Sequence, residues 1–346
     1  MPRKIIQHHF NTPETLAQFN PENTKLADAY LRYLSTTDSS PGTLKTYREN
    51  LNVIWYWNLM YNDNRYFLDW KKADIIAFQS WSLDECQHSA NRVHNLKAVI
   101  SSMSNYIEDI LDAEHPEFKK ISHRIPNPTI VPRMEKSVFH MRDINILLGQ
   151  LTFQGQYDRA CCLALAVCSG RRRTELLRFK LSDFTEERLV CNGALYKSAP
   201  LRTKGPGREG KKIECYVLHH QFKPYLDRWL AYRNRHGITT DILFPTAADP
   251  AKSIDYRTLN EWATAFCKYT PLPFYWHAMR HLTVTNFKRA GVPDSVIQEY
   301  LHWSSADMLK IYNDMPKEEA FAMYFNPDGT YGGIPTNIGD ITFEKE

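Results

Sequence analysis

The sequence predicts a mainly α-helical protein with a small β-sheet, arranged as an N-terminal helical domain and a C-terminal mixed α+β domain. Apolar residues recur at helical spacing through most of the chain, whereas the alternation typical of strands is confined to residues 187–218. A basic, proline-containing stretch at residues 115–137 separates two helical regions. A chain of 346 residues, 43% of them hydrophobic, is long enough to bury a core in each domain.

The composition narrows the classes of function. The formal net charge of +4 permits binding to nucleic acid without requiring it. No segment approaches the roughly 18 consecutive apolar residues that cross a membrane, and no secretory signal precedes the first polar run, so we expect no membrane partner. The 7 cysteines are scattered. Cys161, Cys162 and Cys168 lie in an apolar run and are interpreted as buried thiols, which predicts a reducing cytoplasm.

Residues 22–120 form the predicted N-terminal domain, preceded by a loose arm at residues 1–21 that is too short to be an additional DNA-binding domain. Ser40 and Pro41 match a helix N-cap followed by a first-turn proline. The aromatic run Val53–Trp57 is interpreted as core packing. The four expected helices are Lys25–Leu34, Ser40–Met60, Ala73–Leu83 and Ser89–Leu111.

Residues 121–138 are predicted to form an extended, basic linker. Pro126 and Pro128 disfavour a helix, and Arg124 and Arg133 supply positive charge. Such a linker usually stays solvated, but between two DNA-binding lobes it would also lie along phosphates. The sequence favours neither interpretation.

Residues 139–325 form the predicted second domain, and the tail at residues 326–346 is expected to have little fixed structure. Turn residues separate three expected strands, Arg188–Cys191, Ala194–Ala199 and Ile213–Leu218. The expected helices are Met141–Leu151, Arg159–Cys168, 221–234, 256–269, 277–290, 294–302, 305–313 and 316–325.

The segment Tyr275–Tyr312 concentrates the reactive side chains of the second domain. It contains His277, Arg280, the run Leu301–Ser305 (Leu-His-Trp-Ser-Ser) and a terminal tyrosine. A planar, permanently charged guanidinium suits the binding of phosphate oxygens, and a phenol is a competent nucleophile. The segment therefore indicates a site that binds a phosphodiester and attacks it.

These residues resemble the C-terminal signature of the tyrosine site-specific recombinases, the group of phage integrases, Xer-type resolvases and Cre. The run from His277 to His281 (His-Ala-Met-Arg-His) is similar to the family's His-x-Leu-Arg-His-Thr, whose last histidine usually packs structurally. Leu301–Ser305 is similar to Leu-Gly-His-Ser-Ser, with Trp303 in the His/Trp place, where its indole N–H can bond a phosphate oxygen. The family's nucleophile lies nine positions later, and 312 − 303 = 9 identifies Tyr312.

The resemblance extends upstream to the run Ser-Gly-Arg-Arg-Arg-Thr-Glu-Leu. The family's box is Thr-Gly-Leu-Arg-x-x-Glu-Leu, and aligning Gly170 and Glu175 places the catalytic arginine at Arg172. Glu175 is expected to brace that guanidinium through a charge-assisted bond. Arg171 and Arg173 are expected on the other sides of a helix, in contact with the DNA backbone or solvent.

The family also carries a lysine on a β-hairpin turn that reaches the scissile phosphate. We assign it to Lys204, which precedes a Gly-Pro-Gly turn, and keep Lys197, Lys211 and Lys212 as alternatives. His302 occupies the family's glycine position. There it either alters the local turn or brings a second imidazole near the site.

The resemblance implies a metal-independent mechanism. Arg172 and Arg280 would clamp the phosphate, and Tyr312 would attack it to leave a 3′-phosphotyrosine and a free 5′ hydroxyl. Lys204 would protonate the leaving 5′ oxygen, and His277 would assist as a base or hydrogen-bond donor. No carboxylate cluster accompanies these residues, so we expect no metal and no nucleotide cofactor.

The sequence therefore predicts a site-specific DNA recombinase, an integrase of a phage or mobile element. The resemblance implies a SAM-like helical core-binding domain and a catalytic domain acting on double-stranded DNA with specific recombination sites, as a tetramer in the synapse. Whether accessory DNA-bending proteins take part is left open. The expected location is the cytoplasm, at the nucleoid, or the host cytoplasm if the protein is phage-encoded. Two alternatives are a non-cleaving DNA-binding protein of the same fold and a type IB topoisomerase.

Overall fold

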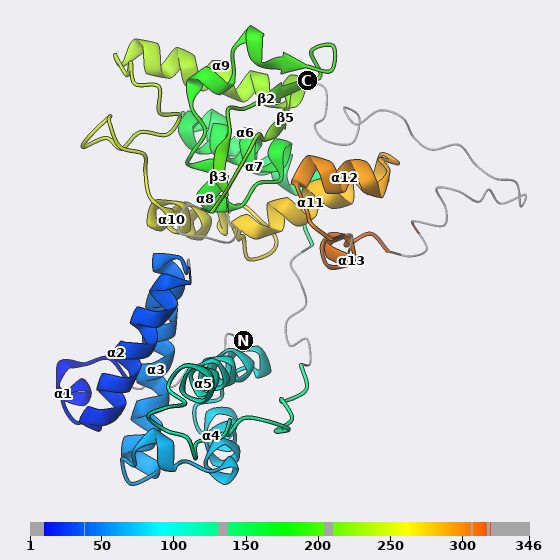
Figure 1. Ribbon diagram of the computed structural model, residues 1–346. Coiled ribbons are helices and arrows are strands. Elements are labelled where there is room, and N and C mark those ends of the chain that lie inside the picture. Colours follow the sequence, from blue (N-terminus) through cyan, green and yellow to red (C-terminus); the bar gives the residue numbers. More distant parts are fainter. Residues whose placement is uncertain are drawn as a thin grey trace, which may run out of the picture. The chain divides into compact units, whose positions relative to one another are not determined.

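The computed structural model describes residues 10–37, 39–130, 138–203, 210–305, 307–316 and 319. The described chain is mainly helical with two small antiparallel sheets, and it separates into an N-terminal and a C-terminal compact unit (Figure 1). None of the described helices combines the length and apolar composition that a membrane crossing requires. Four predicted features fall wholly or largely outside the described residues: Lys204, the start of the arm, the helix at 316–325 and the tail at 326–346.

The N-terminal unit is a bundle of four long helices whose starts are set by caps. Its described helices are α1 (Pro13–Leu16), α2 (Pro21–Thr36), α3 (Pro41–Tyr61), α4 (Lys72–Asp84) and α5 (Ala90–Ile110). The side chains of Asn20, Ser40 and Ser89 accept hydrogen bonds from first-turn N–H groups of α2, α3 and α5. Leu51 and Ile100 lie at the centre of the shared core, without solvent exposure. The four predicted helices are therefore present, within a few residues of the expected ends.

The residues at both ends of this unit are more ordered than predicted from the sequence. The described part of the supposed loose arm packs on the bundle, where the Phe10 ring lies 5.0 Å from that of Tyr56 and Phe19 is buried. Ile121, the first residue of the predicted linker, also joins this core. Both expectations are wrong for these residues, because their aromatic and aliphatic side chains find apolar surface on the bundle.

The C-terminal unit surrounds two small sheets with helices. Its described helices are α6 (Met141–Phe153), α7 (Tyr157–Ser169), α8 (Arg173–Leu176), α9 (His219–Arg235), α10 (Tyr256–Phe266), α11 (Trp276–Arg289), α12 (Asp294–Leu301) and α13 (Asp307–Tyr312). The strands are β1 (Leu189–Val190), β2 (Leu195–Lys197), β3 (Leu201–Thr203), β4 (Lys211–Ile213) and β5 (Tyr216–Leu218). The sheets have the orders β1-β2-β5 and β3-β4.

The predicted strand over 213–218 is interrupted, and β3 was not predicted. In the antiparallel register Lys197 pairs with Tyr216 and Leu201 pairs with Ile213, so residues 198–200 oppose residues 214–215. Position 200 is a proline, which has no N–H to donate, and the extra residue forms an irregular step between the two sheets. One long hairpin is thereby divided into two short sheets.

Helix α7 is the centre of the C-terminal unit (Figure 1). Every residue from Ala160 to Ser169 is buried, and α6, α9 and α11 all pack against this helix. Cys161, Cys162 and Cys168 are free thiols without solvent exposure, as predicted, and burial raises their pKa well above the usual range. Because α7 is held on all sides, the turn that follows it is anchored in the core.

Candidate active site

The turn after α7 requires a glycine and presents Arg172. Gly170 has φ +60, and a Cβ there would lie 2.8 Å from Leu301 Cδ2, so a side chain would be both strained and too close. Arg172 follows in an extended conformation as the N-cap of α8. The buried Glu175 accepts hydrogen bonds from Arg172 N and from Arg172 Nη1, both at 3.1 Å. The predicted bracing contact is therefore present.

Of the two arginines beside Arg172, Arg173 lies on a helix and is exposed as predicted, whereas Arg171 is not. Arg171 was expected to face DNA or solvent, but it is 2% exposed and donates a hydrogen bond to the Tyr300 carbonyl. The expectation assumed a continuous helix, whereas the extended backbone at Arg172 turns the preceding side chain into the core. Arg173 is exposed, bonds Asn260 and lies 5.5 Å over the Tyr256 ring.

Arg280 on α11 is a buried cation with unfilled hydrogen-bonding capacity. It is 1% exposed, and its Nη1 donates to the Gly170 carbonyl at 2.8 Å. Its Nε and Nη2 have no partner among the described residues. Burial, followed by the charges of Arg172 and Arg171, lowers the pKa of Arg280 to about 10, so it stays charged at neutral pH. A site of this kind suits an anion that accepts the remaining bonds.

Tyr312, the last residue of α13, lies beside His277 and Arg280. Its hydroxyl is 2.9 Å from His277 Nε2, and its ring lies 5.5 Å from the Arg280 guanidinium carbon. Partial burial, then the charges of His281, Arg280 and Arg172, lowers the pKa of His277 to about 4. A neutral imidazole at this position can accept the phenol's proton.

Two residues follow α12: Trp303 packs against the ring of Tyr312, whereas His302 contacts the chain between β4 and β5. Trp303 is buried, its ring lies 5.0 Å from that of Tyr312, and its Nε1 has no partner in the described part of the chain. His302 has φ +51, the left-handed conformation that favours glycine, so the family's glycine geometry is retained. Its Nε2 lies 2.7 Å from the Glu214 carbonyl, so the imidazole contacts the hairpin base.

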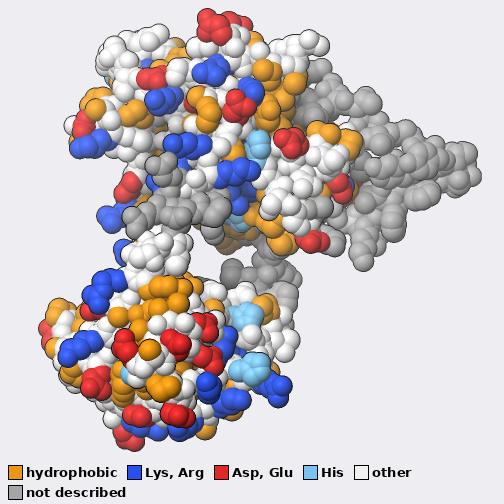
Figure 2. Space-filling model, in the orientation of Figure 1, with side chains coloured by type: hydrophobic (Ala, Val, Ile, Leu, Met, Phe, Trp, Pro, Cys, Tyr) orange, Lys and Arg blue, Asp and Glu red, His pale blue; other side chains and the backbone are white. Residues whose placement is uncertain are grey.

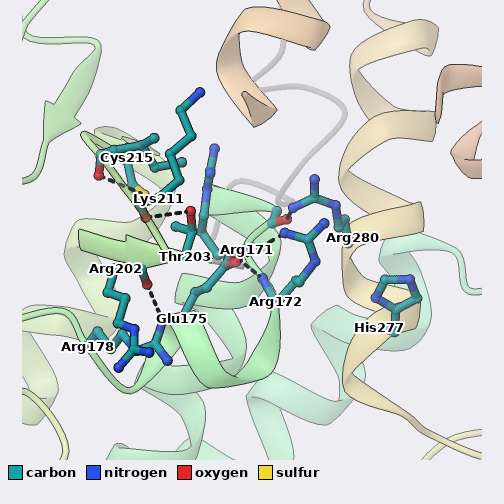
Figure 3. A network of polar contacts seen from close by, with 12 residues as sticks. Arg171, Arg172, Glu175, Arg178, Arg202, Thr203, Lys211, Cys215, His277 and Arg280 are labelled. Carbon is teal, nitrogen blue, oxygen red and sulfur yellow. Dashed lines mark hydrogen bonds and ion pairs between the residues drawn. The ribbon is translucent and has the colours of Figure 1, made fainter. Parts of the chain in front are cut away.

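The β3–β4 hairpin lies next to the arginine turn. Figure 3 shows Lys211 and Thr203 on the hairpin beside Arg171 and Arg172, with Arg280 and His277 across from them on α11. Lys197, one of the alternatives to Lys204, forms an ion pair with Glu214 at 2.7 Å. Lys211 and Lys212 begin β4, at the end of the hairpin nearest its turn. Lys204 itself remains a prediction.

A cavity of about 460 Å³ opens beside these groups. Arg172, Tyr275 and His277 are among the residues that line it. Within the described residues, no three His, Cys, Asp or Glu side chains are grouped to hold a metal ion.

Figure 2 shows Lys, Arg and His side chains gathered in the middle of the visible face of the C-terminal unit, whereas acidic and basic groups alternate on the N-terminal unit.

Sequence reasoning missed one side chain close to the nucleophile. Asp314 Oδ2 lies 3.0 Å from His281 Nδ1, and the His281 ring lies 4.5 Å from the Tyr312 ring. His281 was expected only to pack. The signal available in the sequence was an aspartate two positions after the predicted nucleophile, which no motif singles out.

Comparison with known proteins supports the resemblance seen in the sequence. Residues 142–319 match the model of the phage integrase family. The chain belongs to the phage integrase family. A recombinase-like protein derived from the SPbeta prophage of Bacillus subtilis (strain 168), YomM, is 26% identical over 258 residues, 72% of each chain.

Solved structures share the fold. The XerH recombinase in its post-cleavage complex with a palindromic difH substrate matches with TM-score 0.63 at 16% identity, covering 88% of this chain and 96% of that one. A lambda integrase (75–356) dimer bound to a COC′ core site matches with TM-score 0.62 at 14% identity, covering 84% and 95%. The predicted family and the predicted fold class, mainly α with a small sheet, are therefore confirmed.

Proposed function

We propose that this integrase-family protein is a site-specific recombinase that cleaves and rejoins DNA strands through a 3′-phosphotyrosine. The observation that carries the proposal is the placement of Tyr312. Its hydroxyl is bonded to His277 beside Arg280, a buried cation whose Nε and Nη2 have no described partner. A phosphodiester entering there would meet a nucleophile, a base and a charged clamp together.

The chemistry follows from these groups. Arg280 and Arg172 bind the non-bridging oxygens and stabilise the charge that develops on them. His277, neutral at physiological pH, takes the phenol's proton as the Tyr312 oxygen bonds to phosphorus. The bond from phosphorus to the 5′ oxygen breaks, and that oxygen takes a proton from the hairpin lysine, which we assign to Lys204. Rejoining reverses these steps with a 5′ hydroxyl as the nucleophile.

Further support comes from the chemistry of the other residues at the site. The unpartnered indole N–H of Trp303 suits a phosphate oxygen, and Glu175 holds Arg172 in position. A non-cleaving DNA-binding protein would need none of this arrangement. A type IB topoisomerase is disfavoured by membership of the integrase family.

We assign the partners on the same basis. The XerH structure contains a difH substrate, and a lambda integrase tetramer is bound to a Holliday junction. By similarity, this protein binds double-stranded DNA at specific sites with residues 22–120 and 139–325, joined by a basic linker at 121–138. It acts as a tetramer on DNA in the cytoplasm.

A nicked suicide substrate tests the function. Cleavage close to the nick releases a short fragment, so the covalent protein–DNA adduct accumulates and is seen by denaturing gel electrophoresis. The unaltered protein should form the adduct, and Tyr312→Phe should form none while binding DNA with the same affinity, because only the nucleophilic oxygen is lost. An adduct formed by Tyr312→Phe would place the nucleophile at another residue. Relaxation of plasmids that lack any specific site would instead favour the topoisomerase.

A further inference from the structure

One stripe of α11 holds the segment that carries Tyr312. His277, His281, Thr285 and Arg289 are spaced four residues apart, so they follow one ridge of the helix over about 18 Å. Each of them contacts the chain between residues 312 and 319.

The contacts advance in the same order along both segments. His277 bonds the Tyr312 hydroxyl at 2.9 Å, and His281 pairs with Asp314 at 3.0 Å. Thr285 Oγ1 accepts a hydrogen bond from Asp314 N at 3.1 Å. Arg289 binds Glu319 through both carboxylate oxygens, at 2.6 and 3.1 Å.

The middle contact differs from the last one in burial. The His281 and Asp314 side chains are 10% and 9% exposed, whereas the Arg289 and Glu319 side chains are 20% and 39% exposed. A largely buried pair that holds the residue two positions after Tyr312 restrains the tyrosine more strongly than an exposed ion pair does. His281 also lies against the Tyr312 ring, so one imidazole restrains both the phenol and the backbone beyond it.

We infer that the His281–Asp314 pair is a positioning element for the nucleophile, with Thr285 and the Arg289–Glu319 ion pair as outer contacts of the same ladder. This inference rests on the proposed role of Tyr312. The pair holds the backbone after Tyr312 on α11, so the phenol oxygen stays between His277 and Arg280. Neither His281 nor Asp314 takes part in the bond changes at phosphorus.

The first test measures single-turnover adduct formation at saturating DNA. Asp314→Ala should slow adduct formation roughly 10–100-fold, the effect of displacing a reacting group by about 1 Å. DNA affinity should not change. Asp294→Ala is the matched control, because it removes an ion pair with Lys288 near the same helix without touching the ladder. An unchanged rate in Asp314→Ala overturns the inference.

A second test separates positioning of the tyrosine from support of the whole site. In Tyr312→Ala, hydrogen peroxide replaces the phenol as nucleophile. The peroxide anion bonds to phosphorus, the bond to the 5′ oxygen breaks and that oxygen takes a proton. Adding Asp314→Ala should leave this peroxide-driven cleavage within about three-fold. If Asp314→Ala slows peroxide-driven cleavage as much as it slows adduct formation in the protein that retains Tyr312, then Asp314 maintains the phosphate-binding groups instead.

A third measurement does not depend on activity. Hydrogen exchange of the full-length protein should accelerate at residues 309–316 in Asp314→Ala, and not in Asp294→Ala or at residues 160–169 of α7. If exchange at residues 309–316 is unaltered in Asp314→Ala, the inferred positioning role is wrong, whatever the rate of adduct formation. Absence of any adduct with the unaltered protein overturns the proposed function, however exchange responds.

Discussion

The two units bury polar groups in different ways. In the N-terminal unit four of the eight buried polar residues that the structure describes are asparagines, and two of these bond backbone groups: Asn23 bonds the Arg65 carbonyl and the Phe67 N–H at 2.9 and 2.8 Å, and Asn58 bonds the same carbonyl at 2.8 Å. In the C-terminal unit, the buried Arg171, Glu175 and Arg280 lie around the turn after α7, and the donors of Arg280 are left partly unfilled. The first pattern stabilises loops, whereas the second costs stability and is retained for a ligand.

A comparison within the C-terminal unit shows that burial of a charge is not the decisive feature. Arg233 and Arg280 are both 1% exposed. Arg233 donates from both terminal nitrogens to the carbonyls of residues 240, 242 and 243, so it fastens a loop to α9. Arg280 donates to one carbonyl and leaves Nη2 free. The Nε of each arginine lacks a partner among the described residues, so the unfilled terminal nitrogen of Arg280, rather than burial, distinguishes the two.

The largest expected effect separates these two arginines. Arg280→Ala should reduce the cleavage rate roughly 10²–10³-fold with little loss of stability. Arg233→Ala should lower the free energy of unfolding by about 2 kcal/mol or more, because it leaves buried carbonyls unpaired, while the folded fraction still cleaves. Single-turnover cleavage and urea denaturation measure the two effects. If Arg280→Ala and Arg233→Ala lost the same activity and had the same stability, the two arginines would not differ in the way proposed.

The next effect concerns the three adjacent arginines. Arg172→Ala should slow cleavage roughly 10²-fold or more, because Arg172 is the braced cation at the mouth of the site. Arg173→Ala should change the rate less than about five-fold, since that side chain is exposed and bonds Asn260. Arg171→Met should act mainly on stability through the lost bond to Tyr300. If Arg173→Ala were the most damaging change in the cleavage assay, the assignment of Arg172 would be wrong.

A smaller effect is expected in the N-terminal unit. Asn58→Ala should lower the free energy of unfolding by about 1–2 kcal/mol, because the Arg65 carbonyl loses a buried donor. The chemical step on bound DNA should be unaffected. Thermal denaturation and single-turnover cleavage at saturating DNA measure the two quantities. A slower chemical step would show that this unit also shapes the site.

The last effect is a pH dependence of stability that arises from His277. Its pKa is about 4 in the folded protein, below the ordinary 6.5, so the unfolded chain binds more protons between these values. The contribution of neutral His277 to the free energy of unfolding is fully present above pH 6.5, and it is lost as the pH falls through about 4. His277→Gln should flatten the dependence of stability on pH in this window. An unchanged slope in denaturation curves would show that His277 is not held neutral by its surroundings.

The sequence by itself determined the helices and the identity of the reactive groups. Caps such as Ser40 and Ser89 act within one turn, so the starts of α3 and α5 follow from local chemistry. The spacing of Trp303 and Tyr312, matched to the family's motif, predicts Tyr312 as the nucleophile, and the short elements α12 and α13 place the two rings 5.0 Å apart. The hairpin was predicted less well, since its interruption depends on which residues face Pro200.

Only the tertiary structure decided how Arg171, His281 and Asp314 are used. Arg171 is buried because the end of α12 covers the turn after α7, a contact between residues 129 positions apart. His281 pairs with Asp314 because α13 leads the chain back along α11, 33 positions later. Such pairings join side chains through the packing of whole elements, and no local pattern of residues encodes which surfaces meet.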